Sequence, residues 1–246
     1  MKTPRSLSQA YDFIRNKIIA GDFPPNYRLM TRNLSAESGV SRTPVRDALR
    51  LLEKEGLVDI QPRIGASVKA FDFLSFQEVC EFRLGMESFS ASLAAKKRTP
   101  VELAEIESVG LAMGEMVRQR RVSDDPQLRL ELRKHDIRFH FAIATAAHNR
   151  ELLREIMRLQ VVLHMVSGPM PASTPLDPQA IAERDAAQAA HWRIYEAIRD
   201  RDATAARMAM QHHMQIVNDR ALMAAARKER QHAVDKATLF GATGLA

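Results

Sequence analysis

The pattern of apolar residues changes at about residue 73, and this change constrains the fold more than any other feature of the sequence. Before it, short helical patterns are followed by two short segments in which apolar and polar residues alternate. After it, the strand patterns vanish and long amphipathic helices take over. With 246 residues and 46% hydrophobic content, the chain can build two cores. We therefore predict two domains of different architecture.

Three short helices are expected in the first domain. Apolar residues recur at helical spacing over 7–19, and Gly21 ends this segment. Thr31 is the expected cap of a second helix, which Gly39 ends in a left-handed conformation. Ser41 is the expected cap of a third helix, with a proline in its first turn. Two helices joined by a tight turn that contains glycine form a helix-turn-helix.

A small β-hairpin is expected directly after these helices. The segments 57–60 and 66–68 alternate around a loop that contains Pro62 and Gly65. A helix-turn-helix followed by a hairpin forms a winged helix, in which the hairpin is the wing. We predict this winged helix-turn-helix domain over residues 1–72.

The rest of the chain is predicted to form an all-α antiparallel helical bundle. Breakers or caps stand at Pro100, Pro126, Asn149 and the proline-rich segment 168–178. Methionines at helical spacing are expected to fill the core, namely Met113, Met116, Met157, Met208 and Met210. The bundle is assigned to residues 73–230, and fading periodicity predicts a loose tail over 231–246. The helices are expected near 75–97, 100–121, 127–147, 150–167, 178–200 and 203–227.

The positive charge of the chain is concentrated in its first domain. Residues 1–70 contain 12 Lys and Arg against 7 Asp and Glu, which leaves +5 of the net charge of +6 in this segment. A local basic patch attracts polyanions such as nucleic acid. Charge alone does not separate this interpretation from an ordinary solvated surface.

Cysteine content and hydropathy bear on the compartment. Cys80 is the only cysteine, which excludes an internal disulfide and a cysteine zinc cluster and favours a reducing compartment. The first residues lack the apolar core of a signal peptide, and no stretch reaches 18 uninterrupted apolar residues. A cytoplasmic protein that does not insert into membranes is expected.

The start of the third helix carries the residues that could read DNA. Side chains in the first turn of a recognition helix face base edges in the major groove, where arginine can donate two hydrogen bonds to guanine. Serine, threonine and further arginines can contact phosphates, and an arginine at the wing can do the same or enter the minor groove. Each arginine alone could be an ordinary exposed charge, but the whole set together with the wing favours DNA binding. The candidates are Arg32, Ser41, Arg42, Thr43, Arg46 and Arg63.

The stretch LMTRNLSAESGVSRTPVRDALRLLEKEGLVDIQPRIGASV resembles the winged-helix domain of the GntR family, and the likeness extends over residues 7–70. In that family, SRTPVR followed by ALRLLEKEGLV forms the recognition helix and its exit. The resemblance implies that Arg32, Arg42, Thr43 and Arg46 occupy DNA-contacting positions. Asn26 departs from the Pro-Gly turn usual in the family, but asparagine also tolerates a left-handed backbone.

Histidines in the second domain suggest a metal site. Asp136 and His140 stand one helical turn apart, while His191 and His213 lie in two later helices. Three imidazoles and one carboxylate make a suitable set of ligands for zinc, nickel or a similar divalent cation. Because the chain has eight histidines, their spacing alone is equally compatible with a chance arrangement.

A second resemblance covers residues 75–227, which are similar to the helical sensor (FCD) domain of the FadR-type branch of the GntR family. The similarity rests on an Arg-x-x-x-Glu pair, an Asp-x-x-Phe-His motif, a following asparagine and two histidines 22 residues apart. It implies that Asp136, His140, His191 and His213 bind the metal, zinc or nickel foremost. The residues that carry the likeness are Arg83, Glu87, Asp136, Phe139, His140, Asn149, His191 and His213.

The same resemblance suggests a small carboxylate as the effector that binds at the metal. Arg83 could clamp such a carboxylate through two hydrogen bonds, and Asn149 belongs to the same set of positions. His164 could line the cavity, although a histidine packed between helices is the alternative.

The sequence as a whole predicts a transcriptional regulator, a repressor in the first instance, whose affinity for its operator changes when the effector binds. A homodimer on a short inverted repeat is expected, because one recognition helix covers only a half-site. One alternative is a regulator for which the metal itself is the signal. A metal-dependent hydrolase or lyase is the other, but no motif for a general acid or base supports an enzyme.

Overall fold

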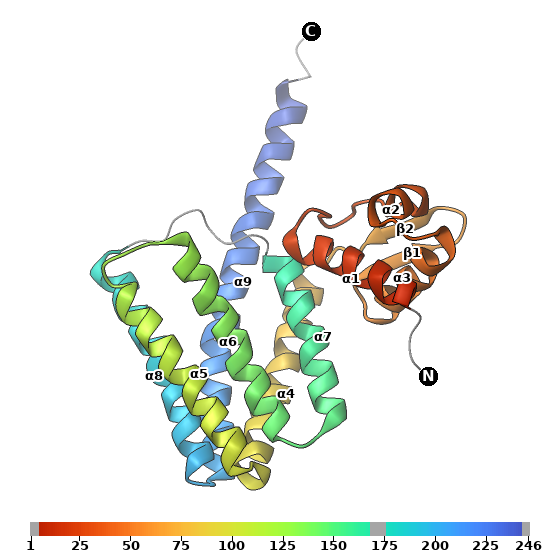
Figure 1. The fold of residues 1–246 in the computed structure, drawn as a ribbon. Helices are drawn as coiled ribbons and strands as arrows, with labels where there is room; N and C mark the ends of the chain where they lie inside the picture. The colour runs from red at the N-terminus through yellow and green to blue at the C-terminus, as the bar shows by residue number, and fades with distance from the viewer. Residues whose placement is uncertain (1–4, 168–175, 243–246) are drawn as a thin grey trace. The chain divides into compact units, whose positions relative to one another are not determined.

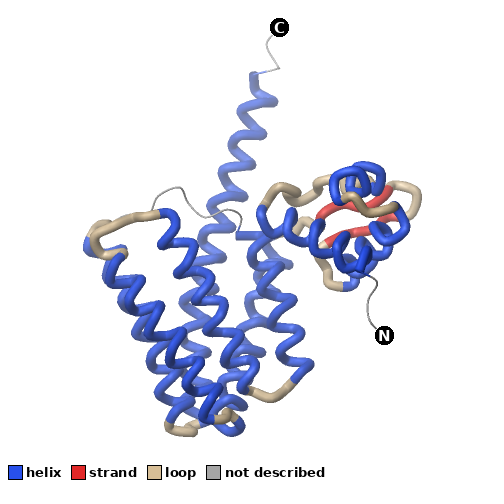
Figure 2. The backbone as a smooth tube through the Cα atoms, viewed as in Figure 1, coloured by secondary structure: helices blue, strands red, loops and turns tan. Residues whose placement is uncertain are grey.

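The computed structural model describes residues 5–167 and 176–242, without the side chains of residues 161, 163–167 and 228–242 (Figure 1). By its contacts the chain divides into two compact units. The first consists of residues 1–76 with 161–169, and the second of residues 77–160 with 170–246. The mainly α fold class is confirmed, because helices dominate and the strands in the described part are confined to a single hairpin (Figure 2).

The first unit is a winged helix-turn-helix. The strands of its hairpin pair antiparallel, with Val58 opposite Val68 and Gln61 opposite Gly65. An additional bridge joins Arg28 to Ser67 at the edge of the hairpin. The elements are α1 (Arg5–Ala20), α2 (Thr31–Ser38), α3 (Arg42–Lys54), β1 (Val58–Gln61) and β2 (Gly65–Val68).

Local residue chemistry explains most of the boundaries in this unit. Gly39 ends α2 with a φ of 68°, as predicted, and Asn26 takes a φ of 67°, a left-handed conformation that asparagine tolerates. Ser41 is the N-cap residue of α3, but its side chain accepts no capping hydrogen bond. Thr31 was the expected cap of α2 and is instead its first helical residue, because Met30 is the last extended residue and takes the N-cap position.

The second unit is a bundle of antiparallel helices, as the sequence predicted. Its helices are α4 (Phe73–Lys97), α5 (Pro100–Gln119), α6 (Pro126–Ala146), α7 (Arg150–Ser167), α8 (Pro178–Arg199) and α9 (Ala203–Ala242). Of α4 and α7, residues 77–97 and 150–160 belong to this unit. Prolines stand at the first position of α5, α6 and α8, where a missing amide donor costs nothing.

The end of α9 corrects the sequence analysis. A helix ending near 227 and a loose tail from 231 were expected, whereas α9 continues to Ala242. Neither glycine nor proline interrupts the chain between Ala203 and Gly241, so nothing local ends the helix even where the apolar periodicity fades.

The core of the bundle combines large apolar side chains with alanines that let the helices approach closely. Phe139, Ile106 and Ile194 are fully buried at its centre. Methionines only partly fill this core: Met113 and Met210 are among the buried ones. Met157 and Met208 were expected there too, but their side chains are 46% and 64% exposed.

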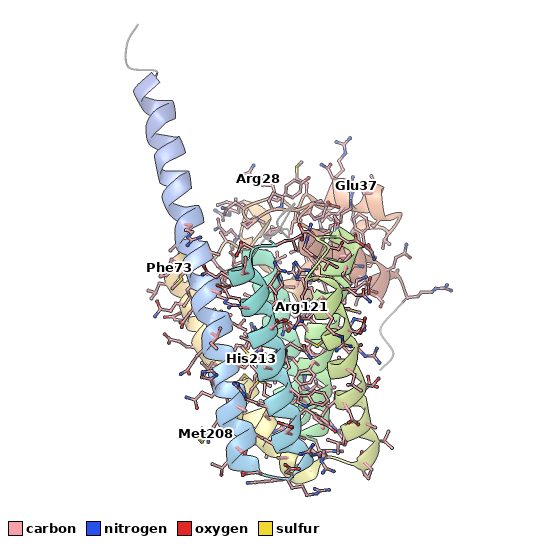
Figure 3. All side chains as sticks on the ribbon, turned by 90° about the vertical axis from the view of Figure 1, so that its left-hand side faces the viewer. Arg28, Glu37, Phe73, Arg121, Met208 and His213 are labelled. Carbon is pink, nitrogen blue, oxygen red and sulfur yellow. The ribbon has the colours of Figure 1, made fainter. Side chains whose placement is uncertain are left out.

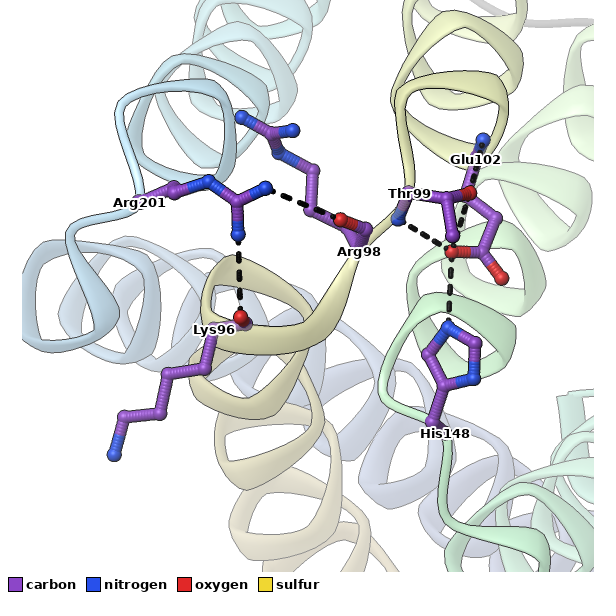
Figure 4. Close-up of polar contacts among 6 residues, drawn as sticks. All are labelled: Lys96, Arg98, Thr99, Glu102, His148 and Arg201. Carbon is purple, nitrogen blue, oxygen red and sulfur yellow. Dashed lines mark hydrogen bonds and ion pairs between the residues drawn. The ribbon is translucent and has the colours of Figure 1, made fainter.

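Two arginines tie the inter-helix turns together at one end of the bundle. Arg98, just after α4, donates to the backbone oxygens of Ile198 and Arg199 at the end of α8. Arg201, just after α8, donates in return to the oxygens of Lys96 and Arg98 (Figure 4). Each arginine therefore donates to carbonyl groups at the C-terminal end of a neighbouring helix, where backbone donors run out.

The adjoining turn is fixed by a capping box. The Thr99 hydroxyl accepts from the Glu102 amide, while the Glu102 carboxylate accepts from the Thr99 amide. His148 places Nε2 3.0 Å from the same carboxylate (Figure 4).

Among the described residues, no helix is long and apolar enough to span a membrane.

Candidate functional site

Three buried histidines meet inside the helical bundle. His140 comes from α6, His191 from α8 and His213 from α9 (Figure 3 labels the last). One nitrogen from each lies within 4.8 Å of the other two. The rings of His191 and His213 are 4.3 Å apart between centroids, and those of His140 and His213 are 5.3 Å apart. The structure thus brings together the three histidines that the sequence selected.

Helix packing determines which histidines face inward. Phe139 packs its ring edge against His191 at 5.1 Å, next to the buried His140. On α9 the choice lies between adjacent residues: His213 is 3% exposed, whereas His212 is exposed to solvent. The helical register therefore supplies His213 to the cluster and excludes His212.

Three of the histidine nitrogens make no hydrogen bond in the part of the chain that the structure describes. Both ring nitrogens of His191 and Nε2 of His213 are buried without a hydrogen bond in the described part of the chain. Leaving a polar group buried and unsatisfied costs about 1–3 kcal/mol. A divalent cation would satisfy these nitrogens, so the residues present fit a metal.

Burial keeps His213 in the form that binds metals. Burial, together with the nearby His191 and His140, lowers the pKa of His213 to about 2. The imidazole is therefore neutral at physiological pH. Neutral imidazole is the ligand form of histidine, so no proton has to be displaced from it.

Asp136 lies at the margin of the cluster rather than within it. Its Oδ1 is 3.1 Å from Nε2 of His191, without the alignment of a hydrogen bond, and its side chain is 42% exposed. Partial burial disfavours its charged form, but His191, His140 and His213 outweigh this and hold the pKa of Asp136 well below its usual range. The carboxylate is therefore ionised beside the histidines, and its exposure opens this side of the cluster.

A buried carboxylate orients His140 from α4. Glu87 contacts Nδ1 of His140 with Oε2 and accepts from Nε of Arg83 at 2.5 Å with Oε1. Burial alone would raise the pKa of Glu87, but Arg83 and His140 hold it at about 2. Burial likewise opposes the charged form of His140, yet Glu87 raises the pKa of His140. This contact leaves Nε2 of His140 as the nitrogen that can bind a metal.

The three expected effector residues differ in where the structure places them. Arg83 is 6% exposed and belongs to the network around the histidines, with Glu87 as its partner in the described part. Asn149 lies nine residues beyond His140 and accepts from the amide of Leu152, so its side chain caps α7. The side chain of His164 falls outside the described residues.

The residues expected to read DNA all lie on the surface of the first unit. Arg42 and Thr43 begin α3, and Arg46 follows one turn later on an exposed face. Ser41 and Arg32 are exposed next to them.

The wing adds a third basic position to this surface. Arg63 turns the hairpin with a φ of 66° and is exposed beside Ile64, which is 65% exposed. In the part of the chain that the structure describes, Arg42, Arg46 and Arg63 form no ion pair, whereas Arg50 pairs with Asp47. These three guanidinium groups are therefore available to an external anion.

Sequence reasoning missed two features of these surfaces. Arg28 is exposed and is bridged to the wing at Ser67, which places a further cation there. Glu87 was noted only as the companion of Arg83, and its contact with His140, 53 residues away, was not foreseen.

Comparison with known families decides the assignment. Residues 7–68 match the model of the bacterial regulatory proteins of the gntR family, and residues 78–216 match the FCD domain. The chain belongs to the GntR family of regulators with an FCD domain. The family resemblance read from the sequence is confirmed for both domains.

Individual relatives agree with this assignment. The chain is 29% identical over 162 residues to the HTH-type regulator YdhC of Bacillus subtilis, covering 66% of this chain and 69% of YdhC. It is 28% identical over 209 residues, 84% of each chain, to the "Probable D-xylose utilization operon transcriptional repressor" of Paenarthrobacter nicotinovorans. The E. coli McbR/YncC structure shares the fold, with a TM-score of 0.67 at 21% identity over 90% of this chain and 99% of that one.

The expected class of function is confirmed at this level. This GntR-family protein is a DNA-binding transcriptional regulator, and its family and relatives are regulators rather than enzymes. The three buried histidines therefore belong to the regulatory domain of a transcription factor.

Proposed function

We propose that this regulator is a repressor whose affinity for its operator is controlled by a small carboxylate bound at a divalent metal in the helical domain. The observation that carries the proposal is the cluster of His140, His191 and His213, with three buried ring nitrogens that lack partners. The name of the Paenarthrobacter relative supports the sign of regulation.

Asp136 is the fourth proposed ligand of the metal. Its oxygen already lies beside His191, and its carboxylate is ionised. Three imidazoles and one carboxylate suit zinc or nickel. When bound, the ion supplies a positive charge that attracts a carboxylate, while Glu87 and Arg83 hold His140 in the orientation that binds it.

Arg83 is the proposed protein contact for the effector carboxylate. It lies in the network around the histidines, and its ion pair with Glu87 is made through Nε. Arginine binds carboxylates through two parallel hydrogen bonds, so its terminal nitrogens suit this task. Asn149 and His164 remain effector candidates from the sequence alone.

A homodimer on an inverted repeat is the proposed form on DNA, because two copies of α3 double the readout. The helical domain offers an apolar surface on which a second copy could pack. Phe82 and Phe89 stand seven residues apart on α4, with side chains that are 52% and 46% exposed. Exposed apolar patches of this kind mark interaction sites. Binding of chromosomal DNA implies that the protein acts in the cytoplasm.

Two neighbouring histidines on α9 provide the test. His213→Ala removes a buried ligand, whereas His212→Ala removes an exposed histidine beside it. Metal content is measured by mass spectrometry on the purified proteins. Binding to an operator selected from random duplexes is measured with zinc, with nickel, and with small carboxylates added to each.

We expect wild type and His212→Ala to contain a stoichiometric divalent ion and to release the operator when the effector carboxylate is added. His213→Ala should lose the metal and the response but still bind the operator. A coupling of about 1–3 kcal/mol between effector and DNA is usual, so release should appear as a 5- to 150-fold change in affinity. Release by metal alone would make the metal itself the signal. The proposal would be contradicted if wild-type protein without metal released the operator fully when the carboxylate was added.

A further inference from the structure

A groove of about 440 Å³ lies between α5 and α8 and is lined by residues of α8 other than His191. Glycines on α5 make room for it. A Cβ atom at Gly110 would lie 3.6 Å from the Trp192 ring, and one at Gly114 would lie 3.3 Å from the amide of Gln188. Volumes of 300–1,000 Å³ with mostly apolar walls are typical of sites for small molecules.

Gln188, which lines the groove, carries a buried hydrogen-bond acceptor that has no donor among the described residues. Nε2 of Gln188 donates to the Gly110 carbonyl at 2.9 Å, which fixes the orientation of the amide. Oε1 of Gln188 is then buried with no partner among the described residues. Because solvent does not reach this oxygen, the Gln188 side chain would have to turn toward the groove for a ligand N–H or O–H group to satisfy it.

One end of the groove is basic. Arg121 pairs with Asp185 across the groove, with nitrogen–oxygen distances of 3.0 and 3.3 Å. Arg118 lies beside them, and its side chain is 63% exposed in a pair with Glu115 on its own helix. Exposed pairs of this type contribute only about 0–1 kcal/mol, so Arg118 can turn to a ligand carboxylate at little cost.

The opposite end is apolar. Trp192, Leu111 and Ala189 line it. Seven residues separate Trp192 from Asp185, which corresponds to about 10 Å along α8. Along the groove, the apolar surface at Trp192 is thus followed by the Gln188 amide and then by the guanidinium group of Arg118. Together they cover about the length of a small molecule.

We propose that this groove is a second small-molecule site, which binds an amphipathic carboxylic acid with an N–H or O–H group between its apolar end and its carboxylate. An N-acylated aliphatic amino acid has this chemistry. The site is separate from the metal cluster, because α8 turns His191 into the bundle and Trp192 into the groove.

Fluorescence tests the proposal directly, because Trp192 is the only tryptophan of the chain. The probe is N-acetyl-L-leucine, added to the full-length protein. Two analogues each lack one feature: 4-methylpentanoate lacks the amide N–H, and N-acetyl-L-leucinamide lacks the carboxylate. We expect a saturable change in Trp192 emission with the probe and at least tenfold weaker binding of each analogue. No saturable change with the probe would overturn the proposal.

Two matched pairs of variants locate the ligand. Ala189→Leu fills the groove, while Ala186→Leu adds the same side chain at another exposed position of α8. We expect the first to abolish binding and the second to leave it unchanged, with both proteins showing the far-UV circular dichroism of wild type.

The second pair tests the carboxylate contact. Arg118→Gln should weaken binding of N-acetyl-L-leucine about tenfold, the equivalent of about 1.4 kcal/mol. Arg154→Gln is the control, since Arg154 is equally exposed and pairs with a glutamate three residues earlier on α7. Binding that survives Ala189→Leu but disappears in His213→Ala would place the ligand at the histidines and overturn the proposal.

Discussion

Replacing Glu87 by glutamine should weaken both the fold and the metal site. The side chain is 2% exposed and links Arg83, which is 7% exposed, to His140. Removing one partner of a buried ion pair costs about 3–5 kcal/mol. Because glutamine keeps one oxygen that can accept from Arg83, we expect the lower end, about 3 kcal/mol.

The effect on the metal is a separate quantity. Loss of a group that orients a ligating histidine typically lowers metal affinity about 10- to 100-fold, or about 1.4–2.7 kcal/mol. Urea unfolding of the metal-free protein, followed by circular dichroism, measures the first effect. Competition for zinc against a chromophoric chelator measures the second.

Glu102→Gln is the matched control for Glu87→Gln. Glu102 also contacts a histidine, His148, but at an exposed turn rather than at the metal cluster. We expect it to cost about 1 kcal/mol of stability through the damaged capping box and to leave zinc affinity unchanged. Wild-type zinc affinity in folded Glu87→Gln would refute the role given to this carboxylate.

Three further predictions concern DNA binding and assembly. Arg46→Ala should reduce the preference for the operator over random DNA by about 1–3 kcal/mol, while Arg50→Ala should leave this preference unchanged. An equal preference in wild type and Arg46→Ala would exclude base readout by Arg46. Arg32→Ala should lower the affinity for all DNA sequences alike. It should also reduce the slope of log affinity against log salt concentration by about 0.9. An unchanged slope would exclude a phosphate contact by Arg32. Joint replacement of Phe82 and Phe89 by aspartate should yield monomers in sedimentation experiments, and a persistent dimer would place the interface elsewhere.

Residues that act on their immediate neighbours were the most predictable from the sequence. Gly39 ends α2 and Asn26 takes a left-handed conformation because each needs only its own backbone to do so. The end of α9 was not predictable in the same way. Fading periodicity indicates that a helix no longer has a buried face, but it does not end the helix. A breaking residue would do so, and no glycine or proline stands between Ala203 and Gly241.

Interactions across the bundle were predictable only in part. Spacing and family resemblance selected His140, His191 and His213, and the structure brings them together. The contact between Glu87 and His140 depends on how α4 packs against α6, which no local pattern specifies. The groove has the same origin, because it exists only where two glycines of α5 face Gln188 and Trp192 of α8.

The position of the histidines explains why a metal could act on the whole helical domain. Its three buried ligands come from α6, α8 and α9, and Glu87 adds α4 through His140. A cation bound there stabilises only the arrangement in which these helices converge, and the stabilisation is about 2.7 kcal/mol when the free metal exceeds its dissociation constant 100-fold. Because buried nitrogens lack other partners, the metal-free bundle keeps an unfavourable contact that small helix movements can relieve. A ligand that altered how the proposed metal is held would therefore shift any equilibrium between packings of these four helices, which is the requirement for a switch.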